Sequence, residues 1–142
     1  NSVAIDLYVA EDTTIKVGNF ALVNLGVSIQ IPKGYKAELR MRSSTFLKYG
    51  LIQTNSLGLI DTTYCSENDI LKLPVFMLIT QEDMINYQKN NSWKAITIPK
   101  GTSICQLEIL PCMEEMEFNE LELEEYKEVN QTTRGGFGST DK

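Results

Sequence analysis

Short segments rich in apolar and β-branched residues, separated by turns, constrain the fold of this chain more than any other feature. Pro32-Lys33-Gly34 and Pro99-Lys100-Gly101 predict tight turns, because proline restricts φ and glycine tolerates positive φ. The segments with the length and composition of β-strands span residues 3–9, 21–31, 37–42, 51–60, 71–79, 95–98, 104–110 and 121–129. Strands at this spacing favour an all-β sandwich or jelly-roll barrel.

Residues 81–93 interrupt the strand pattern. The segment is polar, and we expect it to form one or two helical turns inserted between strands. We interpret its Trp93 as a local packing anchor rather than a ligand contact. A length of 142 residues is enough for one hydrophobic core, so we expect a single domain.

The net charge of -6 is concentrated near residues 114–128, where glutamates alternate with apolar side chains. The alternation from Leu121 to Glu124 suits a strand, and we expect an extended acidic arm with a solvated face. A broad nucleic-acid interface would need a basic stripe instead, so no nucleic-acid partner is predicted. The apolar runs are too short for a membrane-spanning helix, so no membrane association is predicted.

Cysteine and histidine usage restricts the chemistry. Cys65, Cys105 and Cys112 form an odd set without metal-site spacing, which favours a reducing, cytoplasmic environment over disulfides. The chain has no histidine, so acid–base chemistry must fall to carboxylates. An oxygen-bound hard cation is the natural helper for such chemistry.

Residues 58–64 predict a β-hairpin with a carboxylate, Asp61, and an aromatic ring, Tyr64, at its turn. The mouth of such a hairpin can hold a flat ring through backbone hydrogen bonds, with the acid aimed at a neighbouring group. The alternative is that Asp61 only caps backbone amides of the turn, as many turn aspartates do.

Two further segments carry groups that suit phosphate. Arg42-Ser43-Ser44 offers a guanidinium fork and two hydroxyls after a strand, although a surface arginine with a helix-capping serine pair would look the same. In the turn and strand at residues 101–107, Gln106 alternates with apolar Ile104 and so faces a different environment, which can be solvent alone.

The C-terminal segment, residues 134–140, is rich in glycine and carries one cation, one aromatic ring and two hydroxyls. Glycine lets backbone amides approach phosphate closely, and Phe137 could stack on a base. The segment does not match a P-loop. A flexible terminus or a cloning remnant is the alternative.

In this order, five of these segments resemble the five motifs of the trimeric dUTPase family, and the resemblance spans nearly the whole chain. The insertion at 81–93 and the Arg-Ser-Ser spelling look closest to bacterial or bacteriophage-type members. The five motif-like segments are residues 3–7, 42–44, 55–67, 101–107 and 134–140.

The resemblance implies one dUTPase domain over residues 1–142, with a distorted jelly-roll (β-clip) core. That core would run to residue 129 and include the insertion and the acidic arm strand, and 130–142 would form a mobile glycine-rich lid. It also implies a homotrimer that exchanges C-terminal arms and assembles each active site from three chains.

The implied activity is hydrolysis of dUTP to dUMP and pyrophosphate with Mg²⁺, which keeps uracil out of DNA and supplies dUMP for thymidylate synthesis. By resemblance, Asp61 would activate the water that attacks the α-phosphorus. Tyr64 would pack on the deoxyribose and exclude a 2′-hydroxyl. Asn55 would read the uracil edge together with main-chain groups of Gly58 and Ile60.

The remaining implied roles concern the phosphates and the lid. Arg42 and Gln106 would join Asp61 in catalysis by holding phosphates. Asp6 would support hydrated magnesium, and Phe137 would stack over uracil as the lid closes. The other implied substrate contacts are Ser43, Ser44, Arg134, Gly138, Ser139 and Thr140.

Two other functions remain open from the sequence. One is a dCTP deaminase of the same fold. The other is a regulatory protein that binds the nucleotide without hydrolysing it. Whichever function holds, the insertion at 81–93 could contact another protein.

Overall fold

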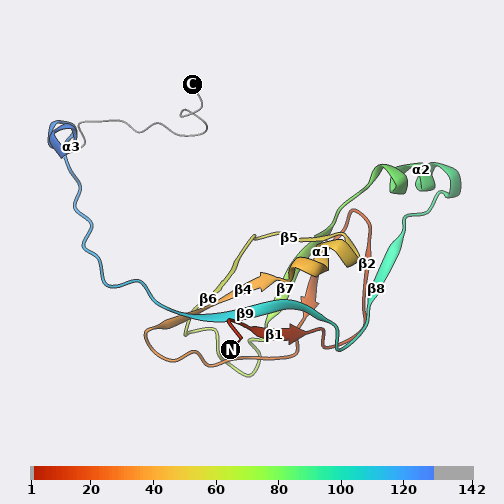
Figure 1. Ribbon diagram of the computed structural model, residues 1–142, viewed down its shortest axis with the longest axis horizontal. Coiled ribbons are helices and arrows are strands. Elements are labelled where there is room, and N and C mark those ends of the chain that lie inside the picture. Colours follow the sequence, from red (N-terminus) through yellow and green to blue (C-terminus); the bar gives the residue numbers. More distant parts are fainter. Residues whose placement is uncertain (1, 130–142) are drawn as a thin grey trace. The chain divides into compact units, whose positions relative to one another are not determined.

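The structure, a computed structural model, describes residues 2–129 and divides into two units, Asn1–Cys112 and Met113–Lys142, which are considered separately. The first unit holds every strand of the described residues (Figure 1). These strands are β1 Ile5–Tyr8, β2 Thr13–Lys16, β3 Phe20–Asn24, β4 Tyr35–Met41, β5 Leu51–Gln53, β6 Gly58–Ile60, β7 Lys72–Met77, β8 Ala95–Ile98 and β9 Ser103–Pro111.

The strands form three antiparallel sheets, ordered β1-β9-β4-β6, β3-β7-β5 and β2-β8. All three sheets contribute to one hydrophobic core: Leu39 and Ile104 come from the first, Leu73 from the second and Ile98 from the third. Burying each such side chain contributes about 1.5–3 kcal/mol. The predicted all-β fold is confirmed.

The two predicted turns are present. The amide of Tyr35 donates to the carbonyl of Pro32 at 3.1 Å, and the amide of Thr102 donates to the carbonyl of Pro99 at the same distance. The third residue of each turn is a glycine, with φ of 84° at Gly34 and 79° at Gly101. A side chain with a Cβ would be strained at these angles.

The predicted hairpin at 58–64 does not form as a pair of strands. β6 pairs with β4 instead, and the residues after Asp61 form a loop that runs to β7. Local side-chain bonds explain the difference, because Asp61 accepts from the amide of Thr63 and Asp69 accepts from the amide of Ser66. Such bonds compete with a strand ladder for the same amides.

Other differences are smaller. The strand predicted for 51–60 is divided into β5 and β6 by a turn. The strand predicted for 21–31 ends with β3 at Asn24, and residues 25–31 are not in a strand. Strand β2 and the short helix α1 (Ser43–Tyr49) were not predicted; α1 ends at Gly50, which is in the left-handed conformation. Both are too short to show a clear hydrophobic period.

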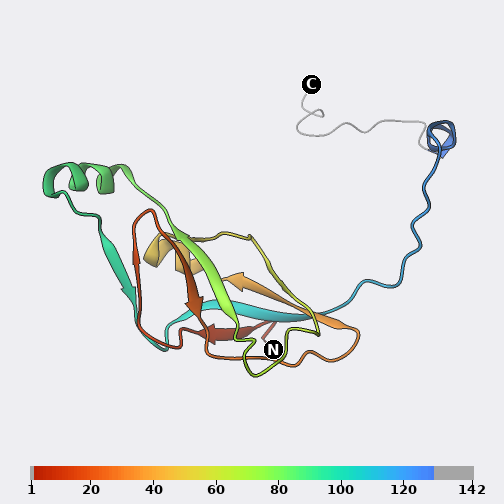
Figure 2. The same cartoon turned by 180° about the vertical axis from the view of Figure 1, so that it is seen from behind.

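The predicted helical insertion is confirmed as α2, Gln81–Asn90, at one end of the first unit (Figures 1 and 2). Thr80 and Asp83 form a reciprocal capping box at its start. The Tyr87 and Trp93 rings stack with centroids 4.3 Å apart, which confirms Trp93 as a local packing anchor. Asp83 is the only buried residue of α2, so local bonds rather than core packing hold this helix.

The second unit contains helix α3, Leu123–Val129, so the strand predicted at 121–129 is wrong. Leucine, glutamate and lysine are good helix formers, and the helix adds a 2.8 Å ion pair between Glu124 and Lys127. The Glu125 carboxylate accepts the amide of Glu122 at 3.1 Å, which caps the first turn. Residues 113–122 have neither helix nor strand.

Cys65, Cys105 and Cys112 are all free thiols. Cys105 is fully buried on β9, and burial, followed by the charge of Asp6, raises the pKa of its thiol to about 12. Within residues 2–129, no helix is both long enough and apolar enough to cross a membrane.

Candidate active site

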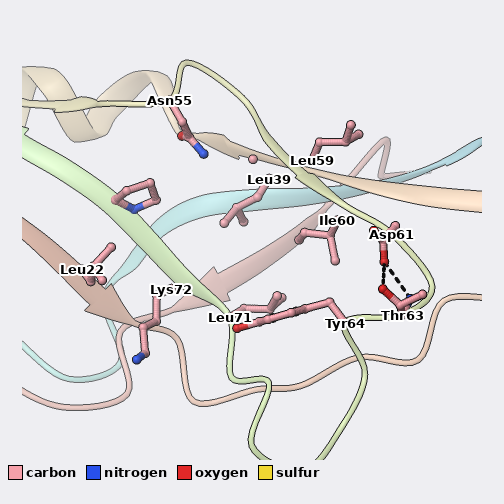
Figure 3. A pocket seen from close by; sticks show the side chains of 12 residues that line it. Leu22, Leu39, Asn55, Leu59, Ile60, Asp61, Thr63, Tyr64, Leu71 and Lys72 are labelled. Carbon is pink, nitrogen blue, oxygen red and sulfur yellow. Dashed lines mark hydrogen bonds between the residues drawn. The ribbon is translucent and has the colours of Figure 1, made fainter.

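A pocket of about 560 Å³ opens where β6 and the loop after it face β3, β4 and β7 (Figure 3). Five residues of the motif-like segment 55–67 that were proposed as site residues line it: Asn55, Gly58, Ile60, Asp61 and Tyr64. Its lining consists of Leu22, Leu39, Asn55, Gly58, Leu59, Ile60, Asp61, Thr63, Tyr64, Leu71, Lys72 and Pro74.

Asp61 lies at one end of this pocket, immediately after β6. Its Oδ1 accepts two hydrogen bonds from Thr63, from the amide at 2.7 Å and from the hydroxyl at 2.6 Å (Figure 3). The hydroxyl of Thr63, then its amide, lower the pKa of the Asp61 carboxyl. Asp61 therefore caps a turn amide, as the alternative interpretation expected, and also presents an ionised carboxylate to the pocket.

Tyr64 forms part of the pocket wall. Its hydroxyl donates to the carbonyl of Ile70 at 3.2 Å, which ties the two ends of the loop between them. Tyr64 as a whole is 41% exposed, so part of its aromatic side chain remains available to a ligand.

Asn55 lies at the other end of the pocket, in the turn between β5 and β6 (Figure 3). Gln53, which the sequence analysis missed, holds it: the Gln53 amide nitrogen donates to Asn55 Oδ1 at 2.9 Å and to the carbonyl of Leu39 at 3.0 Å. The Gln53 oxygen accepts the amide of Met41 at 2.9 Å. The Gln53 side chain thus bonds to main-chain groups of β4, as a neighbouring strand would, and it holds Asn55 in place.

Gly58 allows β6 to approach β4 closely beneath the pocket. A Cβ at this position would lie 3.1 Å from the Cβ of Leu39, its partner across the sheet. A larger residue would push the two strands apart and disturb the neighbouring Ile60 main chain.

Asp6, Arg42, Ser103 and Gln106 form a second group, the Asp6 cluster. Arg42 Nη1 donates to Asp6 Oδ2 at 2.7 Å and to Ser103 Oγ at 2.8 Å, and Gln106 Nε2 donates to Asp6 Oδ1 at 2.9 Å. Asp6 and Gln106 are direct partners across β1 and β9, which places both on the same face of the sheet. Ser103 was missed, although its hydroxyl lies inside the 101–107 segment.

Two bonds to the carbonyl of Ile104 fix the position of Arg42. The amide of Arg42 donates to it at 3.0 Å, and the hydroxyl of Thr45 in α1 donates at 2.7 Å. Arg42 is the N-cap residue of α1 without a side-chain cap bond, and Ser43 and Ser44 are the first residues of the helix rather than its caps.

The Asp6 cluster and the pocket are separate groups within one chain, because the pocket lining contains none of the four cluster residues. The proposed tail residues lie outside the described residues; they are Arg134, Phe137, Gly138, Ser139 and Thr140. Over residues 2–129, no group of three or more His, Cys, Asp or Glu side chains could hold a metal ion.

The sequence model of the dUTPase family matches residues 1–141, and the chain belongs to the dUTPase family. The SPbeta prophage-derived deoxyuridine 5′-triphosphate nucleotidohydrolase YosS of Bacillus subtilis strain 168 is 38% identical over 136 residues. That alignment covers 96% of this chain and 82% of the relative.

Solved structures of phage dUTPases share the fold. A mutant dUTPase of Staphylococcus bacteriophage 80alpha with dUpNHpp has a TM-score of 0.74 and 23% identity, covering 99% of this chain and 86% of that one. A mutant dUTPase from phage phi11 of S. aureus, which coordinates a structural Mg(II) ion, has a TM-score of 0.67 and 20% identity, covering 87% and 86%. The predicted jelly-roll fold and the predicted bacterial and phage relationship are confirmed.

Proposed function

We propose that the chain is a dUTP diphosphatase, which hydrolyses dUTP to dUMP and pyrophosphate. The family match over residues 1–141 carries this proposal. The pocket supports it, because an ionised carboxylate, a half-exposed aromatic ring and an amide side chain share one lining.

Asp61 is the proposed general base. Its ionised carboxylate accepts a proton from a water molecule as the water oxygen bonds to the α-phosphorus. The bond from that phosphorus to the bridging oxygen breaks, and pyrophosphate leaves. Both bonds from Thr63 end on Oδ1, so Oδ2 is the oxygen best placed to hold the water. Phosphoryl transfer needs such positioning more than covalent help.

The other end of the pocket suits the nucleoside. Asn55, fixed by Gln53, would read the uracil edge with the main chain of Gly58 and Ile60. Tyr64 would pack on the deoxyribose and leave no space for a 2′-hydroxyl. The 2′-hydroxyl of a ribose would clash with the Tyr64 ring. This contact would therefore discriminate against UTP.

The phosphate-binding residues of the site would come from a second chain. Arg42, Ser43, Ser44 and Gln106 carry donors that suit phosphate, yet the pocket of their own chain does not include them. A homotrimer that juxtaposes the pocket of one subunit with the Asp6 cluster of the next accounts for this separation.

The second unit would supply the contacts that exchange between subunits. Met113 and Phe118 are 70% and 86% exposed in the arm after β9, an arrangement that favours burial against another chain. The tail would close over the nucleotide: Phe137 stacks on uracil, and Arg134, Gly138, Ser139 and Thr140 contact the substrate.

Mg²⁺ is the proposed cofactor, and the donor chemistry fits it. Asp6 is a carboxylate about one-third exposed, beside two phosphate-type donors, so it suits a hydrated ion held mainly by substrate oxygens. When bound, magnesium would neutralise phosphate charge during bond breaking. The hydrogen bonds from Arg42 and Gln106 would keep Asp6 oriented toward that ion.

Pyrophosphate release from dUTP, UTP and dCTP tests the proposed function. With Mg²⁺ present, we expect release from dUTP to be far faster than from the other two, and EDTA to abolish it. Equal turnover of UTP would contradict the role of Tyr64. Ammonia release from dCTP would identify a deaminase instead.

Helix α2 is the proposed contact for a regulatory protein partner. Met84 and Ile85 are 54% and 43% exposed on a helix that buries only Asp83. Deleting residues 81–93 should leave dUTP turnover intact and abolish binding of such a partner; loss of turnover would contradict a separate role. The three free cysteines support the cytoplasmic setting that we also propose.

A further inference from the structure

Thr63 holds Asp61 more tightly than a turn requires. Its backbone amide already satisfies the capping geometry at 2.7 Å, and the hydroxyl adds a second bond of 2.6 Å to the same oxygen. An aspartate that only closed a turn would need the amide alone. The second bond fixes the rotation of the carboxylate about its last torsion angle, so that Oδ1 points to Thr63 and Oδ2 points elsewhere.

We propose that Thr63 is a positioning residue for the reaction, whose hydroxyl orients the Asp61 carboxylate so that Oδ2 can hold the attacking water. The proposal rests on the proposed function of Asp61 as general base. Thr63 itself would not touch the reacting atoms.

Besides Thr63, the backbone amide of Tyr64 acts on the Asp61 carboxyl, as the smallest of the causes that lower its pKa, and no other side chain of the pocket lining donates a hydrogen bond to it. Lys72 from β7 and Tyr64 from the loop are the other titratable side chains in the pocket lining. β3 and β4 contribute only Leu22 and Leu39 to it. A hydroxyl donor to a carboxylate is short and strong, and both properties favour one orientation of the acceptor.

The direction of the Asp61 pKa agrees with this arrangement. The Thr63 hydroxyl is the largest cause of the lowered pKa, ahead of the Thr63 amide, because both stabilise the ionised form. Removing the hydroxyl should therefore make Asp61 a slightly stronger base but a poorly oriented one.

Thr63→Val removes the hydroxyl and keeps the shape, the β-branching and the amide. We expect kcat for dUTP to fall about tenfold, the usual worth of a hydrogen bond to a charged group. KM should stay within about twofold, because Thr63 is not a substrate contact. The acid limb of the kcat profile should move to higher pH, because the ionised carboxylate loses a stabilising donor. Thr63→Ser, which restores the hydroxyl, should return kcat to the wild-type value.

Thr62→Val is the matched control, since the adjacent Thr62 is also exposed and its hydroxyl forms no hydrogen bond within residues 2–129. Wild-type kcat in Thr63→Val, an equal loss in Thr62→Val, or a failure of Thr63→Ser to recover would each overturn the proposal.

A titration of the Asp61 carboxyl carbon by NMR separates this inference from the proposed function. If the wild-type protein did not hydrolyse dUTP, the diphosphatase proposal would fail. The Asp61 pKa should still be higher in Thr63→Val than in the wild type. An identical Asp61 pKa in the two proteins would refute the positioning role whatever the activity.

Discussion

Asp6 and Arg42 are 36 residues apart in the chain, yet their side chains meet at 2.7 Å between Asp6 Oδ2 and Arg42 Nη1. The contact joins β1 to the residue that follows β4, across the intervening strand β9. It leaves the guanidinium oriented by a carboxylate and by Ser103, with both ion-pair partners about one-third exposed. The side chain of such an arginine is already ordered. Binding a phosphate would therefore cost it less conformational entropy.

Arg42→Lys should lower kcat/KM for dUTP by at least about tenfold, because a lysine is a point charge without the planar fork. Steady-state kinetics measure the effect. Arg40→Lys is the control, since Arg40 is more exposed than Arg42 and pairs with Glu38 rather than with Asp6. Equal losses in the two variants would argue for a general charge effect rather than phosphate binding.

Asp61→Asn should lower kcat by about 10²- to 10⁴-fold, the usual contribution of a general base. The amide keeps the size of the carboxylate and can still accept from Thr63, so dUMP should bind within a few-fold of the wild-type affinity. Calorimetric titration with dUMP checks the binding. Asp69→Asn is the control from the same loop, and unchanged turnover in Asp61→Asn would remove the base from the mechanism.

The pH dependence of turnover follows from the lowered pKa of Asp61. A carboxylate with a lowered pKa stays ionised to lower pH, so kcat should show no acid limb until the pH falls below 3.8, the ordinary value for aspartate. The same sign applies to stability: the contribution of this group is present above the unfolded pKa and is lost as the pH falls through the folded one. Initial rates, with circular dichroism at each pH to verify folding, measure this. A limb near pH 6 would point to a different base.

Tyr64→Ala should raise turnover of UTP relative to dUTP by at least about tenfold, because the wall that would meet a 2′-hydroxyl is removed. Competition between the two nucleotides gives the ratio directly. Tyr64→Phe keeps the ring and loses only the bond to the Ile70 carbonyl, so its selectivity should remain near wild type. If both variants lost selectivity alike, the loop bond rather than the ring would set it.

Thr80→Ala should weaken α2 by about 1 kcal/mol, because the substitution removes one half of the capping box. The Thr80 hydroxyl, followed by the Thr80 amide, lowers the pKa of Asp83, so the substitution would remove the main partner of this carboxylate. Hydrogen exchange should increase at amides 81–90 with little change in the sheets. Gln88→Ala on the same exposed helix should leave exchange unchanged, and a uniform increase throughout the protein would show that α2 is not a separately stabilised element.

The elements that depend on local residue preferences were predicted well. β8 has the predicted bounds, both Pro-Lys-Gly turns form, and α2 lies within the predicted insertion. These features depend on short-range preferences of proline, glycine and capping residues. The strand prediction at 121–129 failed for a related reason: alternation over four residues suggested a strand, while glutamate and lysine at helical spacing stabilised α3.

Several residues of the candidate site were predicted from the sequence, but Gln53, Ser103 and the contacts between the residues were not. Asp61, Tyr64 and Asn55 share a pocket as expected, yet nothing in their own segment indicates that Gln53 fixes Asn55 by bonding to β4. The Asp6 cluster depends on the register of β1 against β9, which the order of strands in the sequence does not specify. Sequence patterns identify donors and acceptors, while the pairing of distant strands decides which of them meet.

The stacked pair at the end of α2 also determines what tryptophan fluorescence can report. Trp93 is the only tryptophan in the chain, and it packs on Tyr87 rather than in the pocket beside Asp61. Its emission spectrum is therefore a probe of the inserted helix. A change in that emission on adding dUMP would mean that events in the pocket are transmitted to α2, and a silent spectrum would mean that the two regions respond independently.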